Sequence, residues 1–119
     1  MTFNDYQKQA METLIFNNKI KYYDEDNDKI LARLVLGIAG EAGEVSEKMK
    51  KWLRGDYSYG YSIFKKDIKK ELGDLLWYIA VVAKRLDYRY NLDNIAQANL
   101  EKLAKRKKEG KIKGSGDNR

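Results

Sequence analysis

The sequence predicts an all-α fold, a four-helix bundle, and three observations support this prediction. Apolar residues recur at alternating steps of four and three along two long segments, the spacing that places them on one side of a helix. The chain has no proline, so these segments lack the strongest helix breaker. It also lacks the alternating apolar and polar runs and the Asn-Gly turns that would indicate strands and hairpins.

The N-terminal half of the chain is predicted to hold two helices. The first covers residues 3–17, with Thr2 or Asn4 as its N-cap. Residues 19–28 form a polar stretch whose acidic end suits the N-terminus of the second helix, at residues 29–53. The apolar positions that define the buried side of this second helix are Leu31, Val35, Ile38, Ala42, Val45, Met49 and Trp52.

Three glycines, Gly37, Gly40 and Gly43, lie inside the second predicted helix. Each costs about 1 kcal/mol relative to alanine in a helix interior, so their presence needs a structural reason. We expect either a closely approaching helix or a ligand pressed against the backbone at these positions.

The third predicted helix, residues 63–88, follows a tyrosine-rich loop at residues 54–62. Its apolar positions are Ile68, Leu72, Leu75, Ile79, Val82 and Leu86. Residues 75–83 are apolar on every side, which is typical of a helix surrounded by protein. A four-helix monomer of this size hardly covers such a helix, so we expect a homodimer or a homotetramer with this helix near the interface.

The fourth predicted helix, residues 92–109, stops at Gly110 and completes a single domain over residues 1–110. Residues 111–119 are expected to be a flexible basic tail. Residues 102–119 hold eight basic and two acidic residues and so carry the whole formal charge of +6. Such a segment favours phosphate, nucleic acid or a membrane surface as its partner, and a solvated tail is the alternative.

The chain contains neither cysteine nor histidine, which excludes disulfides, cysteine-based zinc sites and the usual catalytic triads. Chemistry must therefore rest on carboxylates, amines, guanidiniums, hydroxyls and bound ions, and carboxylate oxygens prefer Mg²⁺ or Mn²⁺. The longest apolar run is far shorter than the roughly 20 residues that span a bilayer. No secretory signal is recognisable at the N-terminus, so we expect a cytoplasmic protein without a membrane partner.

Both long helices carry two carboxylates three residues apart, Glu41 and Glu44 on the second helix and Glu71 and Asp74 on the third. Residues at i and i+3 lie about 60° apart around a helix, so each pair projects from one side. Both pairs leave the apolar seam on the same side, so four carboxylates converge if the helices pack antiparallel. Divalent cations relieve the repulsion in such a cluster. Solvated carboxylates paired with lysines, as Glu44 would be with Lys48, are the alternative.

An E-x-x-E motif on one long helix, followed by E-x-x-D on the next, resembles the signature of the MazG-type all-α nucleoside triphosphate pyrophosphohydrolases. Their superfamily includes dCTP pyrophosphatases and dimeric dUTPases. The resemblance covers the whole chain and extends to residues 99–106, which are similar to the family's Asn-x-x-Lys-Leu-x-x-Arg segment. It implies Mg²⁺-dependent cleavage of an NTP or dNTP between its α- and β-phosphates, which cleans or balances the nucleotide pool.

The resemblance also implies the residues of the site. The predicted metal ligands are Glu41, Glu44, Glu71 and Asp74, of which Glu41 and Glu44 are also the predicted catalytic residues. The predicted substrate-binding residues are Asn99, Lys102 and Arg106. Mg²⁺ is the expected cofactor, with Mn²⁺ as the other candidate ion.

Two positions depart from the family pattern. Gly40 and Lys70 stand where many relatives carry glutamate, and a glycine at the first position is similar to the dCTP pyrophosphatase branch. The general base is therefore left open among Glu41, Glu44 and a metal-bound hydroxide. The neighbouring Glu47 is expected to be solvated.

Two other functions remain open at the level of sequence. One is a non-enzymatic helical module that binds nucleic acid through residues 102–119, and the other is a phosphoribosyl-ATP pyrophosphohydrolase with a related fold. Trp52 and Trp77 are predicted to belong to the core. The tyrosines of the loop either stack on a nucleobase or pack against a partner subunit, and the tail cations Lys113 and Arg119 are candidates for contacts with a triphosphate.

Overall fold

The computed structural model describes residues 1–15, 25–58 and 60–117, and these residues confirm the all-α prediction. They form four helices and contain no strand: α1 (Phe3–Glu12), α2 (Glu25–Leu53), α3 (Tyr61–Leu86) and α4 (Leu92–Lys108). The order and approximate extent of the helices follow the apolar periodicity. None of the described helices is long and apolar enough to cross a membrane.

All four helices differ from their predicted boundaries, and α4 differs only by ending at Lys108, one residue early. The first helix ends at Glu12 and not at residue 17, because the backbone N–H of Thr13 turns back to the carbonyl of Ala10. The second helix begins at Glu25 and not at residue 29, so that Glu25, Asp26 and Asp28 of the predicted polar stretch belong to its first turn. The rest of that stretch lies outside the described residues. The third helix begins at Tyr61 and ends at Leu86, two residues earlier than predicted at each end.

The N-terminus of α1 shows which of the two predicted caps is used. The side chain of Thr2 accepts a hydrogen bond from the backbone N–H of Asp5, and the Asp5 carboxylate accepts one from the backbone N–H of Thr2. This reciprocal pair satisfies two backbone donors that would otherwise lack partners. Thr2 is therefore the N-cap, and Asn4, the other predicted cap, instead accepts a hydrogen bond from the backbone of Asp93.

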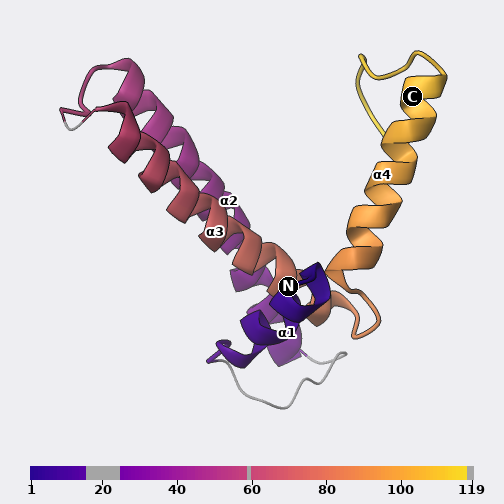
Figure 1. Ribbon diagram of the computed structural model, residues 1–119. Helices are drawn as coiled ribbons and strands as arrows, with labels where there is room; N and C mark the ends of the chain where they lie inside the picture. Colours follow the sequence, from indigo (N-terminus) through magenta and orange to yellow (C-terminus); the bar gives the residue numbers. More distant parts are fainter. Residues whose placement is uncertain (16–24, 59, 118–119) are drawn as a thin grey trace.

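Helices α2 and α3 lie side by side and run antiparallel, as Figure 1 shows. An aromatic cluster holds them together where they are joined. Trp52 of α2 stacks on the buried Phe64 of α3 with ring centroids 5.0 Å apart, and Tyr57 and Tyr61 pack against the same ring. Trp52 is therefore partly buried in this aromatic cluster and does not belong to the main core, contrary to the prediction. Two of the three loop tyrosines belong to the same aromatic cluster. Residue 59, the third tyrosine, lies outside the described part of the chain.

The core lies at the other end of the α2–α3 pair, where α1 crosses it. Its buried apolar residues are Ala10, Leu14, Leu34, Ala80, Val81, Val82 and Leu92. Trp77 packs against this cluster, as predicted, and its indole N–H donates to the hydroxyl of Thr13 at 2.7 Å. The buried Gln7 connects three helices, because its amide donates to the carbonyl of Ala80 and accepts from the backbone N–H of Leu92.

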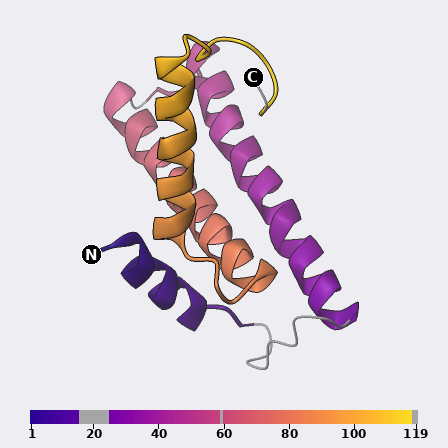
Figure 2. The same ribbon diagram turned by 90° about the vertical axis from the view of Figure 1, so that its right-hand side faces the viewer.

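Helix α4 packs against α1 near this core and then diverges from the α2–α3 pair, so that one chain is V-shaped (Figure 1). Figure 2 shows the chain from the side of α4, which lies in front of the α2–α3 pair. The radius of gyration is 17.4 Å, whereas a compact chain of this length has about 13.5 Å. Many large apolar side chains on the two arms are exposed, among them Leu36, Leu72, Ile79, Leu86, Leu100 and Leu103. The single chain therefore leaves a large apolar surface uncovered.

The three glycines of α2 differ in their surroundings. A Cβ atom on Gly37 would lie 2.1 Å from the Tyr78 ring of α3, whereas a Cβ on Gly40 or Gly43 would meet nothing within 4 Å. The expected close approach of a neighbouring helix is thus found at Gly37. Nothing in the described structure explains the other two.

This difference predicts opposite effects of alanine at two neighbouring positions. Gly37→Ala is expected to lower the free energy of unfolding by about 1–3 kcal/mol, because the partly buried Tyr78 ring must move. Gly40→Ala is expected to raise it by up to about 1 kcal/mol, because alanine is the better helix former and space is free. Denaturant unfolding of the wild type and of both variants measures these changes in the free energy of unfolding. Equal effects would show that helix contact does not select glycine at position 37.

Candidate metal centre

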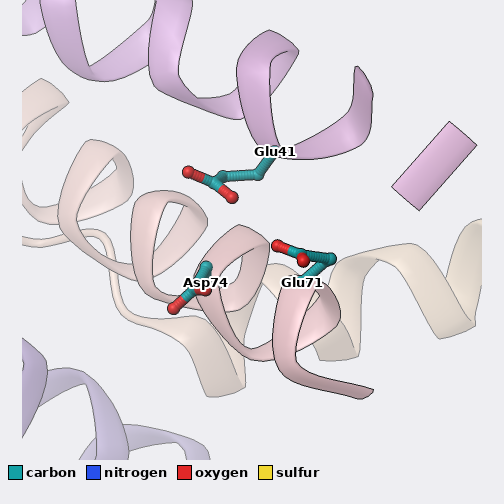
Figure 3. Close-up of side chains that lie close together, drawn as sticks. All are labelled: Glu41, Glu71 and Asp74. Carbon is teal, nitrogen blue, oxygen red and sulfur yellow. The ribbon is translucent and has the colours of Figure 1, made fainter. Parts of the chain in front are cut away.

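The antiparallel α2–α3 pair brings three carboxylates together near its middle. Glu41 projects from α2 toward α3, where Glu71 and Asp74 project from successive turns (Figure 3). One carboxylate oxygen from each of the three residues lies within 4.8 Å of the other two. The spacing of three residues on α3 and the position of the motifs beside the apolar seams explain this convergence. The structure therefore brings three of the four predicted ligands together.

The electrostatics of this cluster favour a cation. The pKa of Glu41 is raised above its usual value, first by partial burial and then by the negative charges of Asp74, Glu71 and Glu44. A raised pKa means that the ionised carboxylate is disfavoured in this surrounding. A divalent ion coordinated by the cluster would remove this penalty, and three carboxylate oxygens are the hard donors that Mg²⁺ and Mn²⁺ prefer.

Glu44, the fourth predicted ligand, is not part of the cluster. It lies one turn beyond Glu41 on α2, is exposed, and has no carboxylate oxygen within the group of three. Its charge nevertheless contributes to the raised pKa values of both Glu41 and Lys48, so Glu44 borders the site. Glu47, which was expected to be solvated, forms ion pairs with Lys50 and Lys51 on its own helix.

Lys48 is a member of the site whose role sequence reasoning missed. Its ammonium lies 3.3 Å from a carboxylate oxygen of Glu71, and both side chains are largely buried, with 23% and 16% exposed. The hydrogen bond to Glu71 is the main reason that the pKa of Lys48 is raised. The sequence suggested Glu44 as the partner four residues away. The pairing of Lys48 with Glu71 depends on the antiparallel register of α2 and α3, which places residue 48 opposite residue 71.

The three predicted substrate-binding residues lie on α4, on the other arm of the V. Asn99 lines an apolar pocket of about 190 Å³ together with Leu76 of α3. Lys102 and Arg106 lie further along the diverging helix, and both contact Asp117. The described structure of one chain thus does not bring Lys102 or Arg106 to the cluster of Glu41, Glu71 and Asp74.

The fold and site together define a class: an all-α protein whose central antiparallel helices present a carboxylate cluster that can hold a divalent cation. The chain belongs to the MazG nucleotide pyrophosphohydrolase family, because the model of the MazG nucleotide pyrophosphohydrolase domain matches residues 31–110. That range includes every carboxylate of the site and the three polar residues of α4. The family resemblance seen in the sequence is therefore confirmed.

The chain also resembles a phage protein over nearly its whole length. It is 40% identical over 114 residues to the "Gene 37 protein" of Mycobacterium phage L5, and the match covers 96% of each chain. No solved structure matches the chain.

Proposed function

We propose that this protein is a Mg²⁺-dependent nucleoside triphosphate pyrophosphohydrolase that cleaves NTPs or dNTPs between the α- and β-phosphates. The observation that carries the proposal is the convergence of Glu41, Glu71 and Asp74 within a MazG domain. Its products would be a nucleoside monophosphate and pyrophosphate, and its role the cleaning of the nucleotide pool in the cytoplasm.

The carboxylates have two tasks in this reaction. Glu41, Glu71 and Asp74 would hold Mg²⁺, or alternatively Mn²⁺, and the proposal includes Glu44 as their fourth ligand. When bound, such an ion would neutralise phosphate charge and polarise the reacting groups. Water attacks the α-phosphorus, the bond from this phosphorus to the bridging oxygen breaks, and pyrophosphate leaves. Glu41 or Glu44 accepts the proton of the attacking water.

Asn99, Lys102 and Arg106 are the proposed contacts to the substrate, and their position on the second arm requires an explanation. The accessible surface of the chain is 9089 Å², whereas a folded monomer of this mass exposes about 6,700 Å². This excess is of the size that each subunit buries in a stable oligomer. We therefore include in the proposal a homodimer or homotetramer in which a second copy fills the V and supplies its α4 to the carboxylate cluster.

The proposal is tested by measuring pyrophosphate release from a panel of ribo- and deoxyribonucleoside triphosphates in the presence of Mg²⁺. We expect turnover of these nucleotides that depends on the divalent ion and that favours some bases over others. Phosphoribosyl-ATP belongs in the panel, because preferential cleavage of this compound would select the alternative within the same fold. Absence of pyrophosphate release from every compound would contradict the proposal.

The nucleic-acid alternative receives less support from the structure. It gives no task to the carboxylate cluster of Glu41, Glu71 and Asp74, and the match to the MazG domain does not favour it. A gel-shift assay in moderate salt, with and without residues 111–119, distinguishes the two functions. Salt-dependent binding that survives neutralisation of the carboxylate cluster would favour the nucleic-acid function.

A further inference from the structure

The segment that follows α4 folds back against the last turns of the helix (Figure 1). The reversal begins at Gly110, which has a φ of 68°, and continues with a hydrogen bond of 2.7 Å from the backbone N–H of Lys111 to the carbonyl of Arg106. We call residues 110–117 the C-terminal strap. It returns residue 117 to the surface of α4 beside Lys102 and Arg106.

Arg106 fastens the strap. Its side chain is only 7% exposed, and its Nη2 donates to the backbone carbonyls of Gly116 (3.3 Å) and Asp117 (2.9 Å) and to the Asp117 carboxylate (3.1 Å). A buried guanidinium requires such acceptors. Because two of the three are backbone carbonyls, most of this attachment does not depend on the side chain of residue 117.

The Asp117 carboxylate makes a second and weaker contact. It lies 3.4 Å from the ammonium of Lys102, and the side chains of Asp117 and Lys102 are 83% and 43% exposed. The two cations, first Arg106 and then Lys102, lower the pKa of Asp117, so the group is a stable anion at neutral pH. An ion pair this exposed is easily exchanged for another anion.

We propose that the Asp117 carboxylate pairs with Lys102 in the free protein, and that the phosphates of the substrate displace this carboxylate from Lys102. Arg106 keeps the strap attached to α4 through the carbonyls of Gly116 and Asp117, and it exchanges only its bond to the Asp117 carboxylate for a phosphate of the substrate. The inference rests on the proposed function, because the displacing anion is the triphosphate. It also rests on the difference between two contacts of the strap. The strap's backbone carbonyls bind the buried Arg106, whereas its one carboxylate pairs with Lys102 at the exposed surface.

The test is the kinetic effect of Asp117→Asn. This variant removes the competing charge and keeps the backbone acceptors, so the KM for the nucleotide is expected to fall by about two- to five-fold with an unchanged kcat. Glu109→Gln is the matched control, because it removes one negative charge at the same end of α4, where Glu109 pairs with Lys111 and not with Lys102. An unchanged or raised KM in Asp117→Asn, or an equal fall in the control, would overturn the inference.

Two measurements without turnover separate this inference from the proposed function. Calorimetric titration with inorganic tripolyphosphate in the absence of metal is expected to show tighter binding to Asp117→Asn than to the wild type. Hydrogen exchange at residues 111–117 is expected to accelerate in Arg106→Gln and to change little in Asp117→Asn. Both results would support the proposed exchange of the Asp117 carboxylate even if no nucleotide were hydrolysed. Equal tripolyphosphate affinity, or unaltered exchange in Arg106→Gln, would refute it even in an active enzyme.

Discussion

Replacing Asp74 by asparagine is expected to lower Mg²⁺-dependent pyrophosphate release by about 10³-fold or more. The substitution keeps the size of the side chain and removes one of the three negative charges that converge on the proposed ion. The loss should arise mainly from weaker metal binding. The Mg²⁺ concentration needed for half-maximal activity is therefore expected to rise wherever activity is still measurable.

Asp67→Asn is the matched control for this substitution. Asp67 also lies on α3, but it pairs with Lys70 and accepts from the Tyr57 hydroxyl, and it is not part of the carboxylate cluster. We expect Asp67→Asn to retain activity within a few-fold of the wild type. Full activity of Asp74→Asn, or an equal loss in both variants, would contradict the assignment of the metal centre.

Glu44→Gln addresses the one predicted ligand that lies outside the cluster. We expect this variant to lose activity on the same scale as Asp74→Asn, because Glu44 is proposed to complete the ion's coordination or to accept the proton. Glu47→Gln, three residues further along the same helix and paired with lysines, serves as the control. Undiminished turnover in Glu44→Gln would remove Glu44 from the proposed ligands and from the candidates for the general base.

A charge placed on the uncovered apolar surface is expected to lower activity about as much as Asp74→Asn does. Ile79 lies on α3 and lines an apolar pocket of about 310 Å³ with Ile38 of α2 and Ile95 of α4. Ile79→Arg would place an unpaired cation in the surface that a second copy is proposed to cover. We expect dissociation of the oligomer, with a subunit Kd raised at least about 100-fold, and loss of activity with it.

The measurement is sedimentation or light scattering of the wild type and of Ile79→Arg over a range of concentrations. Ser62→Arg is the control, because it adds the same charge at an exposed position near the start of α3. A wild type that is monomeric at micromolar concentration, or an active monomeric Ile79→Arg variant, would contradict the proposal that a second copy completes the site.

The sequence allowed the helical fold and the core of the site to be predicted because both depend on helix periodicity. Apolar steps of four and three identified α2 and α3, and the position of the carboxylate pairs beside the apolar seams predicted that Glu41, Glu44, Glu71 and Asp74 would converge. The structure brings Glu41, Glu71 and Asp74 together and leaves Glu44 outside the cluster. Only the antiparallel packing had to be assumed. The match of residues 31–110 to the MazG domain then confirmed the family.

The features that could not be predicted depend on contacts between distant segments. The pairing of Lys48 with Glu71 is set by the register of two helices, whereas the sequence offered only the local neighbour Glu44. The return of Asp117 to Arg106 requires the turn that begins at Gly110. The divergence of α4 from the α2–α3 pair is a tertiary arrangement, which the apolar periodicity of single helices does not specify.

The central claim is tested most directly by identifying the reaction products. Phosphorus NMR of a deoxyribonucleoside triphosphate incubated with the protein and Mg²⁺ in ¹⁸O-labelled water distinguishes the possible cleavage positions. The account predicts a monophosphate that carries the label on its phosphorus, together with unlabelled pyrophosphate, and no reaction after removal of divalent ions with EDTA. A diphosphate with inorganic phosphate, or turnover that persists without divalent ions, would contradict it.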